Sequence, residues 1–229
     1  MSADGVRKLP MFPLGSVLFP AMPLPLRVFE PRYLDLLAAV LPDEPAEFGV
    51  VLIERGQEVG GGDSRFGVGT VAQIVEVESG EGFVVVLALG DRRFEVVEWM
   101  PESDATYPVA EVRDLPSLVW DESFSTLRDE AEKVVRTGLS AASEFIELEW
   151  SPDVQLDDDP IEAVWQLAAI APLGQLDQLD LLRSASVEQL LRALIELTPP
   201  AVDALKFGYT DLDSLDGETD SDDSDDSDD

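Results

Sequence analysis

The feature that most constrains the fold is a change in the spacing of apolar residues near the middle of the 229-residue chain. Before residue 117 the apolar residues form short runs that are separated by proline and glycine, a pattern typical of strands. After residue 117 they recur at the three- and four-residue spacing of helices. We therefore expect an α+β protein, with strands in its first part and a helical bundle in its second.

The first part is predicted to form a small, mostly antiparallel β-barrel, because many short strands accompany a single helix. The helix should begin at Pro31 and end at Pro42, with Tyr33 and Leu37 on its apolar stripe. The runs at residues 48–54 and 83–89 are almost wholly apolar, which predicts strands buried on both faces. Strands are expected at residues 9–12, 17–19, 24–28, 48–54, 68–77, 83–89, 93–97 and 107–113.

The second part is predicted to form four helices, two of them with clear start signals. Asp159 precedes Pro160 as an N-cap, and Ser186 with Gln189 forms a capping box. The helix that starts there should stop before Pro199 and Pro200. Helices are expected at residues 121–149, from residue 160 onward, at 176–182 and at 187–198.

The end of the chain is predicted to be a disordered acidic tail. It is acidic from Gly208, and from Gly217 it contains only Gly, Glu, Thr, Asp and Ser. Such a segment cannot bury enough apolar surface to offset the loss of chain entropy. We accordingly divide the chain into a β-barrel subdomain at 1–116, a helical-bundle subdomain at 117–207 and a tail at 208–229.

Composition excludes several kinds of chemistry. The chain has no cysteine and no histidine, so it has no disulfides, thiolate or imidazole metal ligands, cysteine nucleophiles or Ser-His-Asp triads. Its net charge of −33 opposes binding to nucleic acid and to anionic lipid. The proline-rich run at residues 9–26 does not suit a signal peptide, and no stretch is long and apolar enough to span a membrane. We expect a cytoplasmic protein.

Three glycine- or aspartate-rich strings resemble ligand-binding motifs but are better interpreted structurally. Residues 67–72 (GVGTVA) match a dinucleotide fingerprint, yet β-branched residues follow where a helix is required. Residues 60–63 (GGGD) could cradle an anion, but without a phosphate-binding lysine they favour a turn. Residues 211–217 have a spacing unlike that of an EF-hand calcium loop, which favours a solvated acidic segment. No cofactor and no metal site is predicted.

Catalytic residues are also not predicted. A serine–lysine pair is conceivable, but Lys8, Lys133 and Lys206 lie outside any recognisable nucleophile motif. Carboxylates are so abundant that choosing two as general acid and base would be arbitrary. We expect no enzymatic activity.

The most distinctive string is residues 29–33 (FEPRY). Direct ligand contact is one interpretation, but the structural one is preferred. In it Pro31 starts a helix, Phe29 and Tyr33 pack inward, and Glu30 pairs with Arg32.

Several strings, in order and spacing, resemble the amino-terminal substrate-binding domain of Lon proteases over about residues 8–205. The helical part is similar through residues 165–168 (WQLA) and the 177–182 segment. The remaining matches are residues 9–14 (LPMFPL), 17–20 (VLFP), 23–33 (PLPLRVFEPRY), 48–53 (FGVVLI), 58–62 (EVGGG), 68–72 (VGTVA) and 90–94 (GDRRF).

The resemblance implies a PUA-like β pseudo-barrel followed by a helical bundle, in a stand-alone member that lacks the ATPase and peptidase domains. It implies a non-catalytic module of protein quality control that binds unfolded or extended polypeptides, with a protease or chaperone as further partners. One alternative is a regulatory adaptor of an intact protease. Another is a PUA-like RNA-binding protein using Arg27, Arg32, Arg92 and Arg93, which the net charge opposes. Polypeptide is expected to bind exposed apolar surface on the barrel or in the cleft between barrel and bundle, by strand addition or in an apolar groove. The binding residues and the oligomeric state are left open.

Overall fold

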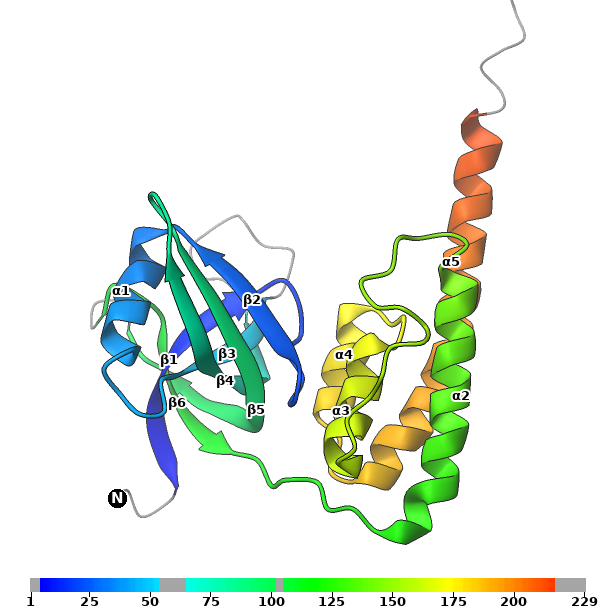
Figure 1. The fold of residues 1–229 in the computed structure, drawn as a ribbon, viewed down its shortest axis with the longest axis horizontal. Helices are drawn as coiled ribbons and strands as arrows, with labels where there is room; N and C mark the ends of the chain where they lie inside the picture. The colour runs from blue at the N-terminus through cyan, green and yellow to red at the C-terminus, as the bar shows by residue number, and fades with distance from the viewer. Residues whose placement is uncertain (1–4, 54–64, 102–104, 217–229) are drawn as a thin grey trace, which may run out of the picture.

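Strands fill the first half of the chain and helices the second, as Figure 1 shows. The computed structural model describes residues 5–53, 65–101 and 105–216, with side chains up to Phe207. The first half contains β1 (Val6–Leu14), β2 (Pro23–Val28), α1 (Pro31–Val40), β3 (Glu47–Ile53), β4 (Arg65–Ser79), β5 (Val84–Trp99) and β6 (Val109–Asp114). The second contains the 3₁₀ turn η2 (Glu122–Phe124), α2 (Ser125–Ala142), α3 (Pro160–Ile170), α4 (Gln175–Leu182) and α5 (Val187–Asp216).

Five strands close into a barrel. The sheet order is β2-β5-β4-β3-β1-β6, and an additional pairing of β5 with β6 completes the ring. Only the β1–β3 pair is parallel among the described strands. The predicted α+β fold, with a mostly antiparallel barrel before a helical bundle, is confirmed.

The barrel interior depends on a close approach between β3 and β4. A Cβ atom added to Gly69 would lie 2.1 Å from the carbonyl oxygen of Val50, so only glycine fits there. The glycine string at residues 67–72 therefore serves strand packing, as the structural interpretation expected. The buried interior residues are Leu9, Met11, Val51, Val71, Phe94, Ala110 and Val112.

Helix α1 covers part of the outer face of the barrel. Tyr33 stacks on Phe12 with 4.0 Å between the ring centroids, and Phe12 lies 5.9 Å from Phe48. Leu36 and Leu37 are buried beside them. The predicted start of the helix at Pro31 is confirmed.

Two strand predictions around β5 are wrong. Residues 83–89 and 93–97 were expected to be separate strands, but they form one strand of 16 residues. Gly90 lies inside this strand, where another segment of the chain passes close to it. A Cβ atom at residue 90 would lie 2.1 Å from the carbonyl oxygen of Phe19, so the position requires glycine. The segment at 17–19, which was predicted as a strand, is instead irregular and crosses β5 at this point.

The first half of β5 is also less buried than its sequence suggested. Val85 and Leu89 are 38% and 43% exposed, so only one face of this segment is covered. The matching prediction for β3 is correct, since five consecutive residues of that strand are buried.

The helix start signals in the bundle are confirmed. Asp159 accepts hydrogen bonds from the amides of Ile161 and Glu162, at 2.8 and 3.1 Å. The Ser186 hydroxyl accepts from the Gln189 amide at 3.1 Å, and the Gln189 side chain accepts from the amide of Ala185 at 3.0 Å.

Two predicted helix ends are wrong. Helix α2 stops at Ala142, where the amides of Phe145 and Ile146 both donate to the Ala142 carbonyl, rather than continuing to 149. Helix α5 continues through its two prolines and beyond residue 208 to Asp216. Packing against α2 overrides the cost of the prolines, since Val202 is buried and lies beside Gly138. The rest of the predicted tail, 217–229, lies outside the described residues.

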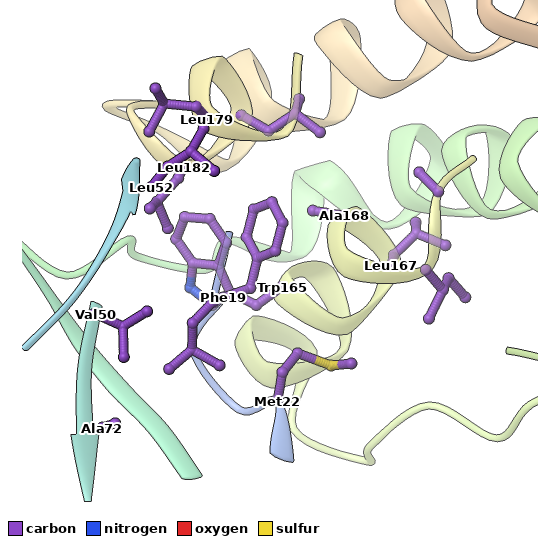
Figure 2. Close-up of a cluster of buried hydrophobic side chains, with 14 of the residues drawn as sticks. Phe19, Met22, Val50, Leu52, Ala72, Trp165, Leu167, Ala168, Leu179 and Leu182 are labelled. Carbon is purple, nitrogen blue, oxygen red and sulfur yellow. The ribbon is translucent and has the colours of Figure 1, made fainter. Parts of the chain in front are cut away.

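Barrel and bundle share apolar packing. Trp165 of α3 and Phe19 lie with their ring centroids 6.1 Å apart. Figure 2 shows both rings between Leu52 of the barrel and Ala168 of α3. One cluster of buried side chains runs through both halves, so the division into subdomains at residues 116 and 117 stays a prediction. Within the described part, every helix is too short or too polar to cross a bilayer.

Arg93 joins the barrel to the bundle by hydrogen bonds. Its guanidinium donates to the backbone carbonyls of Leu182 at 2.8 Å, Ser184 at 2.6 Å and Pro116 at 2.7 Å. Two of these oxygens lie at the end of α4, where helix carbonyls lack partners within the helix. The side chain is 5% exposed, and burial lowers the pKa of its guanidinium. The cation also lies 4.9 Å from the Trp165 ring.

Gly69→Ala should destabilise the barrel by about 3 kcal/mol, because the new methyl group would overlap the Val50 carbonyl. Gly67→Ala is the matched control, since its methyl group would meet no atom within 4 Å. Its effect should stay below about 1 kcal/mol. Urea unfolding measures both, and equal losses would contradict the packing role of Gly69.

Arg93→Met should lower the free energy of unfolding by about 3 kcal/mol, because two buried carbonyls and one partly buried carbonyl lose their donor. Arg113→Met, which breaks an exposed ion pair with Glu95 on the same sheet, should cost less than about 1 kcal/mol. Thermal unfolding of the two variants checks this difference. A near-neutral Arg93→Met would show that apolar packing alone holds the halves together.

Candidate functional site

A cleft opens where the barrel meets the bundle. It has a volume of about 270 Å³. Strand β5, the 115–118 connection and helix α3 form its walls, and Trp165 lies in its floor. We name it the barrel–bundle cleft, and its lining residues are Pro20, Ala21, Gln73, Leu89, Gly90, Asp91, Arg92, Arg93, Leu115, Pro116, Ser117, Leu118, Ile161, Glu162 and Trp165.

An exposed apolar strip leads along β5 into this cleft. Val85, Leu87 and Leu89 alternate along the strand and therefore share one face. In the neighbouring strand β2, Pro23 is paired with Leu89 and Pro25 with Leu87. Paired residues of antiparallel strands lie on the same face, so these five side chains adjoin one another. We call them the apolar strip; Leu89 belongs to both the strip and the cleft.

The free edge of β2 offers little for strand addition. The Gly90 amide donates to the Met22 carbonyl, so the main-chain N–H and C=O groups of Met22 and of every second residue after it point toward β5. The main-chain groups of Pro23, Pro25 and Arg27 therefore point toward the free edge, where the two prolines have no N–H to donate. Docking of side chains onto the strip and into the cleft is favoured over pairing with this edge.

The cleft contains two arginines that are already engaged. Arg92 binds Glu47 at 2.7 Å, Asp91 at 2.6 Å and Asp114 at 3.0 Å, and the hydrogen bond with Glu47 is the main cause that raises its pKa. Arg93 is held by the three carbonyls described above. Both guanidinium groups therefore bind groups of the protein itself.

Glu162 brings unbalanced negative charge to the rim of the cleft. Burial is the largest cause that raises the pKa of its carboxyl group, followed by repulsion from Asp157 and Asp159. The neighbouring groups that raise it are both acidic, so carboxylates gather at this rim. This rim would favour a positively charged group.

A second hollow, of about 430 Å³, lies between α2 and α5. Lys133 and Lys206 line it together with Glu130 and Asp203, so both signs of charge are present. Thr137 and Thr198 line it, but no serine does, and Lys8 lies in β1 of the barrel. The described residues thus do not bring a serine and a lysine together as a catalytic pair in this hollow. They also contain no group of three or more potential metal ligands.

The FEPRY string is partly as predicted. Tyr33 is buried, and Glu30 pairs with Arg32 at 3.0 Å. Phe29 is 65% exposed, so its predicted inward packing is wrong. It directly precedes the turn into α1, where Glu30 has extended backbone and Tyr33 takes the inward position. The GGGD string and the end of the 211–217 string lie outside the described residues.

The sequence suggested the barrel surface or the barrel–bundle cleft as the binding surface, but it did not identify the residues of either. The run at 83–89 was expected to be buried on both faces, which hid the exposed face of Val85, Leu87 and Leu89. A usable signal was present in β2, where prolines at positions 23 and 25 are typical of an edge strand with one open side.

Known proteins are similar in sequence to this chain over most of its length. The family model "ATP-dependent protease La (LON) substrate-binding domain" matches residues 8–198. Lon protease of Escherichia coli (strain K12) is 27% identical over 207 residues, covering 87% of this chain and 25% of the relative. Lon protease of Anaeromyxobacter dehalogenans (strain 2CP-C) is 32% identical over 149 residues, covering 61% of this chain and 18% of the relative. The chain thus spans a quarter or less of the length of these relatives.

Solved structures share the fold. The crystal structure of Lon N-terminal domain protein from Xanthomonas campestris has a TM-score of 0.60 and 28% identity, covering 84% of this chain and 99% of that chain. The N-terminal domain of Mycobacterium avium complex Lon protease has a TM-score of 0.59 and 17% identity, covering 84% and 98%. Together with the family model over residues 8–198, these likenesses show that the chain belongs to the ATP-dependent protease La (LON) substrate-binding domain family.

Proposed function

We propose that this chain is a non-catalytic module that binds unfolded or extended polypeptides through the apolar strip and the barrel–bundle cleft. The observation that carries the proposal is the continuity of the two features, since Leu89 belongs to both. Family membership supports it, because the family model describes a substrate-binding domain. We place this role in protein quality control and in the cytoplasm.

The spacing of the strip suits an extended chain. Alternate residues of a strand repeat at about 6.8 Å, which is also the repeat of alternate side chains in an extended peptide. Val85, Leu87 and Leu89 could thus each meet one apolar side chain of the peptide. A folded protein keeps such side chains inside, so the strip would favour unfolded clients.

The cleft would add a site for a larger side chain. Its aromatic and aliphatic lining includes Trp165, Ile161 and Leu118. Because few side chains would be buried in total, binding should be weak and reversible, as in interfaces of less than about 1,200 Å². Weak binding suits a module that must release its clients.

The alternatives have less support. An adaptor of an intact protease would use a defined folded surface, and pulldown of one specific partner would identify it. RNA binding would require cations, but Arg27 stacks on Phe83 at 3.9 Å and Arg32 pairs with Glu30. Arg92 and Arg93 are engaged as described above.

Replacing both leucines of the strip, Leu87→Thr with Leu89→Thr, should weaken binding of a permanently unfolded model protein about tenfold, because apolar contact area is lost. Val97→Thr is the control, since Val97 is 46% exposed on the same strand but lies beyond the cleft. Fluorescence anisotropy measures the dissociation constants. Equal affinities for the wild type and the double variant would remove the strip from the site.

The purified chain should neither hydrolyse ATP nor cleave casein, because the sequence has no G-x-x-x-x-G-K-[ST] phosphate-binding loop and no recognised catalytic pair. Phosphate release and gel-based proteolysis assays on a homogeneous preparation test this. Turnover that co-purifies with the protein at constant specific activity would contradict the non-catalytic proposal.

A further inference from the structure

The apolar strip has carboxylates along one side. Glu76 of β4 is paired with Leu87 of β5, and Glu78 is paired with Val85. Cross-strand partners share a face, so both carboxylates adjoin the strip. Both residues are exposed, and no ion pair to either is found among the described residues.

One cation lies on the opposite side of the strip. Arg27 of β2 is paired with Val85, and its guanidinium lies 3.9 Å above the ring of Phe83, which positions the group but leaves its charge. Two carboxylates thus face one guanidinium across the strip. The strip is therefore apolar in the middle, with proline along most of one side and unpaired carboxylates along the other.

The cleft at the end of the strip also carries an excess of negative charge. Its lining contains two acidic and two basic residues, but further carboxylates bind or adjoin them. Counted with these neighbours, the group holds six carboxylates (Glu47, Asp91, Asp114, Asp157, Asp159 and Glu162) and three guanidinium groups (Arg7, Arg92 and Arg93). The three arginines are bound to carboxylates or carbonyls of the protein itself.

We propose that the strip and cleft select extended segments in which basic side chains alternate with apolar ones. This inference rests on the proposed function and specifies the class of client. Apolar side chains of the segment lie on Val85, Leu87 and Leu89. The side chains between them leave the opposite face of an extended chain, and only the long stems of lysine or arginine can turn back over β4 to reach Glu76 and Glu78. A segment with glutamate in place of lysine meets like charge at each of these positions, which opposes binding.

The test uses three peptides of equal length with identical apolar residues, alternating with lysine, serine or glutamate. Fluorescence anisotropy at 0.15 M salt should give affinities in the order lysine, serine, glutamate, with lysine and serine differing by about fivefold, from two exposed ion pairs. If none of the peptides binds, the proposed function fails. If the peptides bind equally, or the glutamate peptide binds best, only the charge selectivity is overturned.

A pair of variants separates local from overall charge. Glu76→Gln with Glu78→Gln should reduce the ratio of serine-peptide to lysine-peptide dissociation constants from about fivefold to below about twofold. Glu147→Gln with Glu149→Gln removes the same charge at the same spacing from an exposed segment of the bundle and should leave the ratio unchanged, because separated charges are screened. An equal drop in both variants would assign the preference to net charge and overturn the role of the strip.

Discussion

The arrangement of the two halves depends on one buried cation. Arg93 projects from β5 and donates to carbonyl oxygens at the end of α4 and in the 115–118 connection. A buried charge without partners is costly, so this side chain stabilises the fold only while all three oxygens are in place. Barrel and bundle must therefore meet in one orientation, which also fixes the position of the cleft between them.

Strand β5 contributes to both the junction and the proposed binding surface. Its first half is covered on one face only and carries Val85, Leu87 and Leu89, whereas its second half closes the barrel and carries Arg93. Gly90 separates these parts and allows the chain at Phe19 to pass within contact distance. A single long strand thus fixes the strip relative to the cleft, which a hinge between two shorter strands would not do.

The sequence predicted the class of fold because the apolar spacing and the capping residues report on local structure. Pro31, Asp159 and Ser186 all begin or precede helices as expected. The errors occurred where contacts between residues far apart in the sequence determine whether a strand or helix continues. Gly90 resembled a break in a strand, and Pro199 resembled the end of a helix, but packing against Phe19 and α2 preserves both elements. The residues of the candidate site were missed for the same reason, since the exposure of one face of β5 depends on which elements cover it.

The partners of Arg93 are all main-chain oxygens, and this affects how the junction can tolerate sequence change. Side chains at residues 182 and 184 contribute nothing to these hydrogen bonds, so any sequence that ends α4 with the same turn can accept them. The requirement for a particular residue type falls on the arginine alone. Substitutions that preserve this turn can thus change the bundle side of the joint while the two halves keep their relative position.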